Sequence, residues 1–175
     1  LVSTIRRIDE TIAGLIDCPK TPVAISTLLD QLGRGYLRVA GERGIVLTLA
    51  VTPGMTVAGS AEMVETIVEN LLDNALDFSP AGGSVTITLT PRDGRAVLRV
   101  DDQGPGVAPA DVERIFERHL SSRPQGQGGP SAHYGLGLWI VRRNAEAMGG
   151  RATAANREPG GLSVSVEIPL LRQRG

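Results

Sequence analysis

The sequence predicts an α/β fold, a layered sandwich in which one mixed sheet is covered on one face by helices. Two observations lead to this prediction. Segments with the alternating pattern of strands are interspersed with segments of helical periodicity, and they do not follow the strict β–α–β order of a parallel sheet. The 175 residues are 41% hydrophobic but only 3% aromatic, so aliphatic side chains must fill the core of this domain.

Apolar residues of the first segment repeat at spacings of four and three: Leu1, Ile5, Ile8, Ile12 and Leu15. The pattern indicates either a seam for a partner helix or an amphipathic surface helix. Pro19 and Pro22 end this helix and divide the chain into residues 1–18 and a main domain over residues 19–175. Because Leu1 falls within the helical pattern, we expect the chain to be a fragment of a longer protein.

The main domain divides into further helices and strands. Periodicity predicts helices over residues 24–42, 60–78, 109–117 and 135–148. Alternation predicts strands over residues 45–51, 56–58, 84–90, 96–101, 152–155 and 162–168. Residues 121–134 are rich in Ser, Gly, Gln and Pro without periodicity, and a loop of that length is expected to be functional or disordered.

Composition excludes several classes of function. The net charge of −1, with both signs mixed along the chain, gives no electrostatic reason to expect nucleic acid as a partner. Cys18 is the only cysteine, so neither an internal disulfide nor a thiolate metal cluster is expected. His119 and His133 are the only histidines, too few for a zinc site without carboxylate ligands. We see no signal peptide and no apolar run near the length of a membrane span.

The helix over residues 60–78 carries two different faces. With Asn70 set at zero, Asn74 lies roughly 40° away and Asp77 roughly 20° to the other side. A separate apolar stripe consists of Val64, Ile67, Val68, Leu71, Leu72 and Ala75. Carboxamide oxygens suit a Mg²⁺ ion that also keeps waters and phosphate oxygens. The alternative is a solvated polar edge, but the motifs further along the chain favour the metal site.

A short acidic and glycine-rich motif runs from Asp102 to Gly106, between a predicted strand and a predicted helix. An ordinary turn is one interpretation, since Asp and Gly are common in turns. The alternative is a binding site, because a carboxylate at the end of a buried strand needs partners. An exocyclic amine next to a ring nitrogen, as in adenine, would serve.

A second glycine motif, Gly135-Leu136-Gly137-Leu138, opens the last predicted helix. Glycines at a helix start let phosphates approach free N–H groups and the positive end of the dipole. The alternative is a flexible helix entry. Gly160-Gly161, before the last strand, is predicted to be a turn.

Other nucleotide-binding and hydrolytic motifs are absent from the sequence. Lys20 is the only lysine and no GxxxxGK[ST] occurs, which excludes a P-loop. The GPGVAP stretch lacks the third glycine of a Rossmann fingerprint. Neither GxSxG nor HExxH is present.

Four motifs occur together in a recognisable order: ENLLDNA, DDQGPGV, RIFERHL and, after the loose loop, YGLGLWIV. They resemble the N box, first glycine box, F box and second glycine box of bacterial sensor histidine kinases, over about residues 23–171. The resemblance implies a Bergerat-type ATP-binding fold with a mobile ATP lid, shared with type II topoisomerases, MutL proteins and a heat-shock chaperone. Residues 1–18 would be the end of a dimerisation helix, and residues 19–175 the catalytic ATP-binding domain.

The resemblance assigns a role to each motif. Asn74 would hold Mg²⁺ and Asn70 would support it. Asp102 would accept the adenine amino group, while Gly104 and Gly106 let the base lie close to the backbone.

Further positions follow from the same resemblance. Ser163 would assist Asp102 through water, Phe78 would lie beside the purine, and Phe116 would anchor the lid. The implied nucleotide-binding residues are Asn70, Asn74, Asp77, Phe78, Asp102, Gly104, Gly106, Val107, Tyr134, Gly135, Leu136, Gly137, Leu138 and Ser163. Of these, Asn70 and Asn74 are the implied catalytic residues, and Asn74 is the implied metal ligand.

Some positions depart from the family pattern. Asp77 stands where these kinases usually carry Lys or Arg, and Ser121 stands where an F-box Arg is common. Both changes remove positive charge from the phosphate end, and phosphoryl transfer depends on charge stabilisation. Arg118 or Arg123 could substitute, and His133 is expected to be a solvent-exposed lid residue.

The resemblance gives a leading hypothesis and two alternatives. The first is a kinase domain that transfers the γ-phosphoryl of Mg-ATP to a histidine outside this fragment. The second is a nucleotide-sensing regulatory module, a pseudokinase that binds ATP or ADP without transfer. The third is an ATPase clamp of the MutL or topoisomerase type, whose N box carries Glu where Asn70 stands.

The resemblance also implies partners and a location. The expected partners are ATP or ADP, the protein's own dimerisation and phosphoacceptor domain, and a response regulator. The full-length protein would be a homodimeric phosphoprotein anchored in the inner membrane, with this domain in the cytoplasm, and the fragment can be monomeric.

Overall fold

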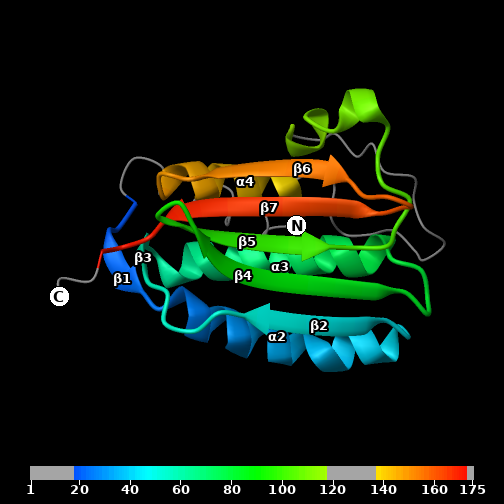
Figure 1. Cartoon of the computed structure of the whole chain (residues 1–175), viewed down its shortest axis with the longest axis horizontal. Coiled ribbons are helices and arrows are strands. Elements are labelled where there is room, and N and C mark those ends of the chain that lie inside the picture. Colours follow the sequence, from blue (N-terminus) through cyan, green and yellow to red (C-terminus); the bar gives the residue numbers. More distant parts are fainter. Residues whose placement is uncertain (1–17, 118–136, 173–175) are drawn as a thin grey trace, which may run out of the picture.

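The computed structural model describes residues 18–117 and 137–172. These residues form the predicted two-layer sandwich, with a five-stranded mixed sheet in one layer and helices over one of its faces (Figure 1). The predicted helix within residues 1–16 and the predicted loop over residues 121–134 lie outside the described residues.

The sheet has the strand order β2-β4-β5-β7-β6. Only β2 and β4 run parallel; the other neighbouring pairs are antiparallel. The strands of this sheet are β2 (Val46–Val51), β4 (Ser84–Arg92), β5 (Arg95–Asp101), β6 (Arg151–Asn156) and β7 (Leu162–Pro169). All five were predicted from alternation, with ends within two residues of those observed.

The β4–β5 hairpin is tighter than the connection between the predicted strands 84–90 and 96–101. Asp93 and Gly94 have φ values of 50° and 74°, the backbone of a two-residue hairpin in which both central residues are left-handed. β4 therefore continues through Pro91. This is possible because Pro91 lies beyond Leu89, the last residue that pairs with β2, so no ladder bond is lost on that side.

Three helices cover one face of the sheet: α2 (Ile25–Glu42), α3 (Ala61–Phe78) and α4 (Gly137–Ala147). α3 begins where Ser60 caps it, its hydroxyl accepting the Met63 N–H at 3.4 Å. The predicted apolar stripe of α3 is at most 2% exposed along its length: Val64, Ile67, Val68, Leu71, Leu72 and Ala75.

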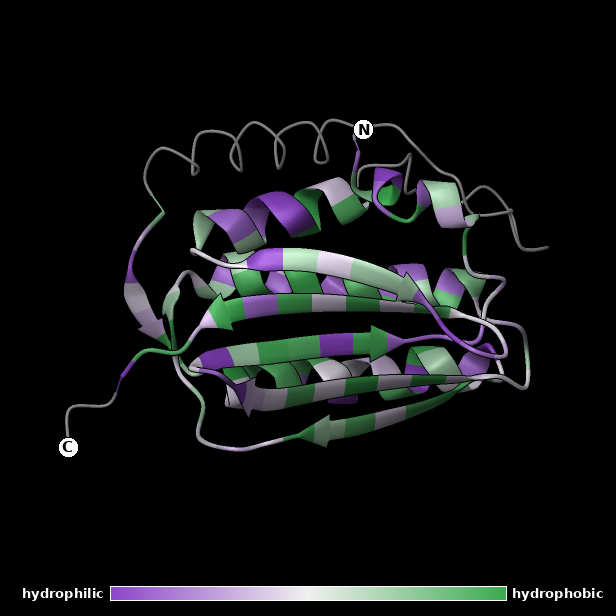
Figure 2. Ribbon diagram, turned by 45° about the horizontal axis from the view of Figure 1, so that its top comes forward, coloured by the Kyte–Doolittle hydropathy of each residue, from purple (hydrophilic) through white to green (hydrophobic). Residues whose placement is uncertain are grey.

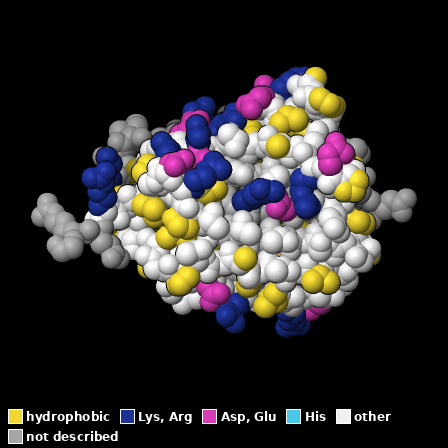
Figure 3. Space-filling view, in the orientation of Figure 1, with side chains coloured by type: hydrophobic (Ala, Val, Ile, Leu, Met, Phe, Trp, Pro, Cys, Tyr) yellow, Lys and Arg dark blue, Asp and Glu magenta, His cyan; other side chains and the backbone are white. Residues whose placement is uncertain are grey.

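The core lies between the helices and the inner face of the sheet, and Figure 2 shows the alternation of apolar and polar residues along the strands. In β4, the fully buried Val85, Ile87 and Leu89 point inward, while Thr86 and Thr88 are part-exposed on the other face. This outer face shows uncharged side chains and backbone for the most part, with scattered charged and hydrophobic side chains among them (Figure 3).

Two predictions about local structure were wrong. Residues 109–117 form two short 3₁₀ turns, Pro109–Asp111 and Arg114–Phe116, instead of one helix, because the segment is too short to sustain helical hydrogen bonding. Residues 21–23, for which no strand was predicted after the Pro19–Pro22 boundary, form β1 (Thr21–Val23), which pairs with β3 (Val57–Gly59).

The segment that follows β7 joins the β1–β3 pair, since Leu170 forms a β-bridge with Val57. Thr21 Oγ1 donates to the Gly59 carbonyl at 2.8 Å, and the Leu171 N–H donates to the Thr56 carbonyl at 2.8 Å. The strand that enters the domain and the segment that leaves it thus lie together, at the end of the sheet opposite the carboxyl end of β5 (Figure 1). Within residues 18–117 and 137–172, no helix combines the length and apolarity that crossing a bilayer requires.

Candidate functional site

Asp102 follows the last residue of the central strand β5 and is 2% exposed. Its Oδ1 accepts the main-chain N–H groups of Gly104 at 2.9 Å and Leu162 at 3.1 Å. The Asp102 N–H in turn donates to the Leu162 carbonyl at 3.0 Å. The sequence predicted a buried acid that needs partners, and these main-chain groups fix the orientation of its carboxylate.

Gly106 turns the loop that follows Asp102. Its φ is +70°, and a Cβ there would lie 2.6 Å from Asn156 Oδ1 and 3.1 Å from the Gly161 carbonyl. Both the backbone conformation and the available space therefore require glycine at this position. The sequence predicted that a glycine was needed here, but not that protein atoms of the β6–β7 turn approach it.

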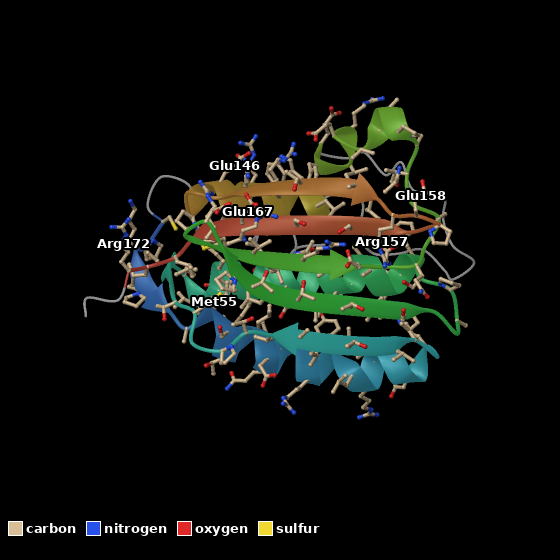
Figure 4. All side chains as sticks on the ribbon, viewed as in Figure 1. Met55, Glu146, Arg157, Glu158, Glu167 and Arg172 are labelled. Atoms are coloured by element: carbon tan, nitrogen blue, oxygen red, sulfur yellow. The ribbon has the colours of Figure 1, made fainter. Side chains whose placement is uncertain are left out.

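The end of β6 and the β6–β7 turn pack directly against this loop. Asn156 Oδ1 accepts the Val107 N–H at 2.9 Å, and its Nδ2 donates to the Val107 carbonyl at 2.7 Å. Arg157 Nη1 donates to the Asp102 carbonyl at 2.7 Å, and Figure 4 shows Arg157 at the end of the sheet where β5 stops. The sequence analysis missed both residues, since nothing in their spacing links them to Asp102.

Gly161 was predicted only as part of a turn, but it makes the closest approach in the site. Its φ is +113°, and a Cβ would lie 2.0 Å from the Asp102 carbonyl oxygen. The last strand can therefore reach Asp102 only because residue 161 has no side chain.

Ser163 takes a different position from the one the resemblance implied. In the β5–β7 ladder it pairs with Asp101, not Asp102. Asp101 forms an ion pair with Arg99 on the outer face of the sheet, at 2.8 Å, and opposed residues share a face. The structure thus does not bring Ser163 to the Asp102 carboxylate; the Leu162 N–H reaches it instead.

The predicted polar row of α3 is half-buried along Asn70, Asn74 and Asp77. Asn70 Nδ2 donates to the Thr66 carbonyl at 2.7 Å. Its Oδ1 would be 3.1 Å from a Cβ on Gly137, so the structure brings Asn70 to the first residue of α4. The predicted second-glycine-box residues 134–136 lie outside the described residues, whereas Leu138 lies in the first turn of α4 and is 9% exposed.

Asp77 Oδ1 forms an ion pair with Arg43 Nη1 at 2.7 Å. This arginine directly follows α2, and the sequence analysis did not single it out. Phe78, the last residue of α3, is half-buried. Tyr36 of α2 donates its hydroxyl hydrogen to Asp73 of α3, and burial together with this carboxylate raises the pKa of Tyr36 above its ordinary value.

Phe116 is 2% exposed, packed beneath α4. The Arg142 guanidinium lies over its ring, 4.0 Å from the centroid, and Arg142 Nη2 also donates to the Ala152 carbonyl at 3.2 Å. The lid that Phe116 is predicted to anchor lies outside the described residues, so the anchoring role stays a prediction. Among the described residues, no three or more His, Cys, Asp or Glu gather into a group that could hold a metal ion by themselves.

The fold and this arrangement of a buried acid, close-approach glycines and part-buried amides define an ATP-binding domain. Residues 59–172 match the family described as histidine kinase-, DNA gyrase B-, and HSP90-like ATPase, and the chain belongs to this family.

Within the family, the chain is a catalytic domain of the sensor histidine kinase type. It is 31% identical to the solved mycobacterial sensor histidine kinase MprB, covering 88% of this chain and 99% of that one with a TM-score of 0.73. Full-length ShkA in complex with AMPPNP is 32% identical, with 91% of this chain and 33% of that chain covered and a TM-score of 0.76. The predicted fold and family are confirmed.

Curated relatives are longer than this chain. The signal transduction histidine-protein kinase BaeS of Escherichia coli is 33% identical over 175 residues, covering 98% of this chain and 37% of BaeS. The sensor histidine kinase GtrS of Pseudomonas aeruginosa is 38% identical over 149 residues, covering 85% of this chain and 29% of GtrS. The chain thus spans about a third of these relatives.

Proposed function

We propose that this domain binds Mg-ATP and passes its γ-phosphoryl group to a histidine outside the chain. The observation that carries the proposal is the buried Asp102 carboxylate, held by the Gly104 and Leu162 N–H groups at 2.9 Å and 3.1 Å. A carboxylate is an acceptor with lone pairs for more than two donors. It can therefore also accept the exocyclic amine of adenine.

The phosphates would lie between α3 and the start of α4. Free N–H groups at the beginning of a helix attract phosphate oxygens, and Gly137 begins α4 without a side chain beside Asn70. Asn70 keeps its amide oriented through the bond to the Thr66 carbonyl at 2.7 Å. These contacts support a phosphate site on the same side of the sheet as Asp102.

The residues present fit a magnesium ion that arrives with the nucleotide. Asn74 offers one neutral hard oxygen, and Mg²⁺ in such sites takes its remaining ligands from phosphates and water. The described residues contain no acidic or histidine cluster that would hold the ion alone. When bound, the ion would supply charge neutralisation for the phosphates; Asn74 would orient them.

The Arg43–Asp77 pair bears on the pseudokinase alternative. That alternative relied on Asp77 and Ser121, which reduce positive charge at the phosphate end. Arg43 Nη1 lies 2.7 Å from Asp77 Oδ1 and offsets its charge, while Ser121 lies outside the described residues. We therefore favour transfer over sensing alone.

In the complete protein, we propose that residues 1–18 end a dimerisation helix and that residues 19–175 form the catalytic domain. The phosphoacceptor histidine would lie on the dimerisation domain, and a response regulator would receive the phosphoryl group. Homodimerisation and attachment to the inner membrane are proposed on the same grounds of family membership.

Calorimetric titration with ADP and ATP, with and without Mg²⁺, tests the proposal. Asp102→Asn should weaken ADP binding by roughly tenfold or more, because one acceptor oxygen becomes a donor. Asp101→Asn is the matched control, since its carboxylate lies on the opposite face with Arg99. Asn74→Ala should remove the Mg²⁺ dependence of ATP affinity.

Equal ADP affinity in the Asp101→Asn and Asp102→Asn proteins would refute the assignment of Asp102. Transfer itself is tested by mixing the domain with its dimerisation domain and labelled ATP. Labelled phosphohistidine is expected, and its absence despite ATP binding would favour the pseudokinase alternative.

A further inference from the structure

Residues 156–161, the last residue of β6 and the turn that joins it to β7, lie against the loop that carries Asp102, although about 50 residues separate them in sequence. Three residues of this segment contact main-chain atoms of that loop: Asn156 and Arg157 do so through their side chains, and Gly161 through close backbone approach. The loop is also held on its other side, where Gln103 Oε1 accepts the Ser84 N–H at 2.9 Å.

Asn156 makes the most specific of these contacts. Its side-chain amide accepts from the Val107 N–H at 2.9 Å and donates to the Val107 carbonyl at 2.7 Å. This is the exchange of two hydrogen bonds that a neighbouring strand would make with Val107. Val107 is only 7% exposed, and shielded main-chain groups need partners, so the amide takes the place of a missing strand.

Gly106 and Asn156 are matched in shape. A Cβ on Gly106 would come within 2.6 Å of Asn156 Oδ1, so the amide occupies the space that a side chain would take. The left-handed Gly106, with φ of +70°, then directs the Val107 N–H and carbonyl to the amide. The path of residues 104–107 is therefore set from β6.

We propose that Asn156 is a positioning residue for the nucleobase, and that selection of adenine over guanine depends on it. The inference rests on the proposed function, because it assumes that Asp102 reads the exocyclic amine. Oδ1 of Asp102 accepts the Gly104 N–H at 2.9 Å, so a change in the path of the following loop disturbs one of the two main-chain bonds that orient the carboxylate. Asn156 fixes that path three residues further on, at Val107, and Arg157 fixes the Asp102 carbonyl.

Two substitutions at Asn156 separate this role from general stability. The residue itself is exposed, so changing it leaves the core intact. Asn156→Ala removes both hydrogen bonds. Asn156→Asp keeps an acceptor for the Val107 N–H but sets a second acceptor against the Val107 carbonyl, so it should not rescue binding. Thr153→Ala, at an exposed position of the same strand, is the control.

The measurement is displacement of a fluorescent ATP analogue by ADP and by GDP, together with thermal melting. Asn156→Ala and Asn156→Asp should lose roughly tenfold in ADP affinity, as expected for two neutral hydrogen bonds, while GDP affinity changes little. Arg157→Ala should lower the ADP-to-GDP preference in the same direction but by less. Thr153→Ala should match the wild type.

An unchanged ADP-to-GDP preference in the Asn156 variants, with ADP still bound by the wild type, would overturn this inference and leave the proposed function standing. A lower melting temperature with unchanged preference would have the same meaning, since it shows a structural role only. A wild-type protein that binds neither nucleotide would overturn the proposed function itself.

Discussion

Replacing Gly161 by alanine perturbs the closest contact in the site. The new Cβ would be 2.0 Å from the Asp102 carbonyl oxygen and 2.9 Å from its carbon. Real Cβ atoms essentially never come within 3.0 Å of such atoms, so the two backbones must separate by about 1 Å. Both partners are main chain, so no flexible side chain can absorb the change.

The expected cost combines two effects. Alanine at a φ of +113° is strained by roughly 1–3 kcal/mol, and forcing atoms into a packed site costs roughly as much again. A total of about 3 kcal/mol should lower the melting temperature by about 10 °C for a domain of this size. Moving the Asp102 backbone should also weaken ADP binding by roughly tenfold, or about 1.4 kcal/mol.

Gly160→Ala provides a matched control. Its Cβ would meet only the Gly104 carbonyl, at 3.9 Å, which is an ordinary contact. Calorimetric unfolding and ADP titration of the two variants side by side give the comparison. Should Gly161→Ala melt and bind as Gly160→Ala does, the loop is not held by close backbone approach, and our account of the Asp102 site is wrong.

Three further outcomes are expected. Gly35→Ala in α2, where no atom lies within 4 Å of the new Cβ, should raise the melting temperature by about 2–4 °C; a decrease would contradict the exposed helical position. The hydrogen bond from Arg151 lowers the pKa of Glu167. The ionised Glu167 therefore stabilises the folded state at neutral pH, and this stabilisation is lost as the pH falls below about 4. Glu167→Gln should therefore melt below the wild type at neutral pH, with the gap closing in acid. Arg43→Ala should weaken ATP binding severalfold, because it leaves the Asp77 charge near the phosphates. The double variant Arg43→Ala/Asp77→Ala should restore ATP affinity. Unchanged ATP affinity in both proteins would exclude a role for the pair.

Most helices and strands could be predicted because hydrophobic periodicity in the sequence encodes them. The buried stripe of α3 repeats at helical spacing, and β4 alternates without a break through Val85, Ile87 and Leu89. β1 was missed because three residues that include Pro22 give no alternation to detect. The 3₁₀ turns were missed because apolar content alone does not distinguish them from one short helix.

The site was predictable only where motifs lie close together in sequence. Asn70, Asn74 and Asp102 each belong to a local pattern that one sequence can display. The Asn156 and Arg157 contacts depend on β6 and β5 both flanking β7, a pairing that no local pattern encodes. Ser163 shows the same limit, because a shift of one residue in strand register moves a side chain to the opposite face.

The β1–β3 pair has a mechanical consequence. Thr21 at the entry of the domain and Leu171 at its exit are both tied to β3 and the residue before it. Polypeptide on either side of the domain is thus joined to it at one corner, and the Asp102 loop lies at the far end of the sheet (Figure 1). A pivot at that corner would carry the whole nucleotide end through an arc without bending any strand.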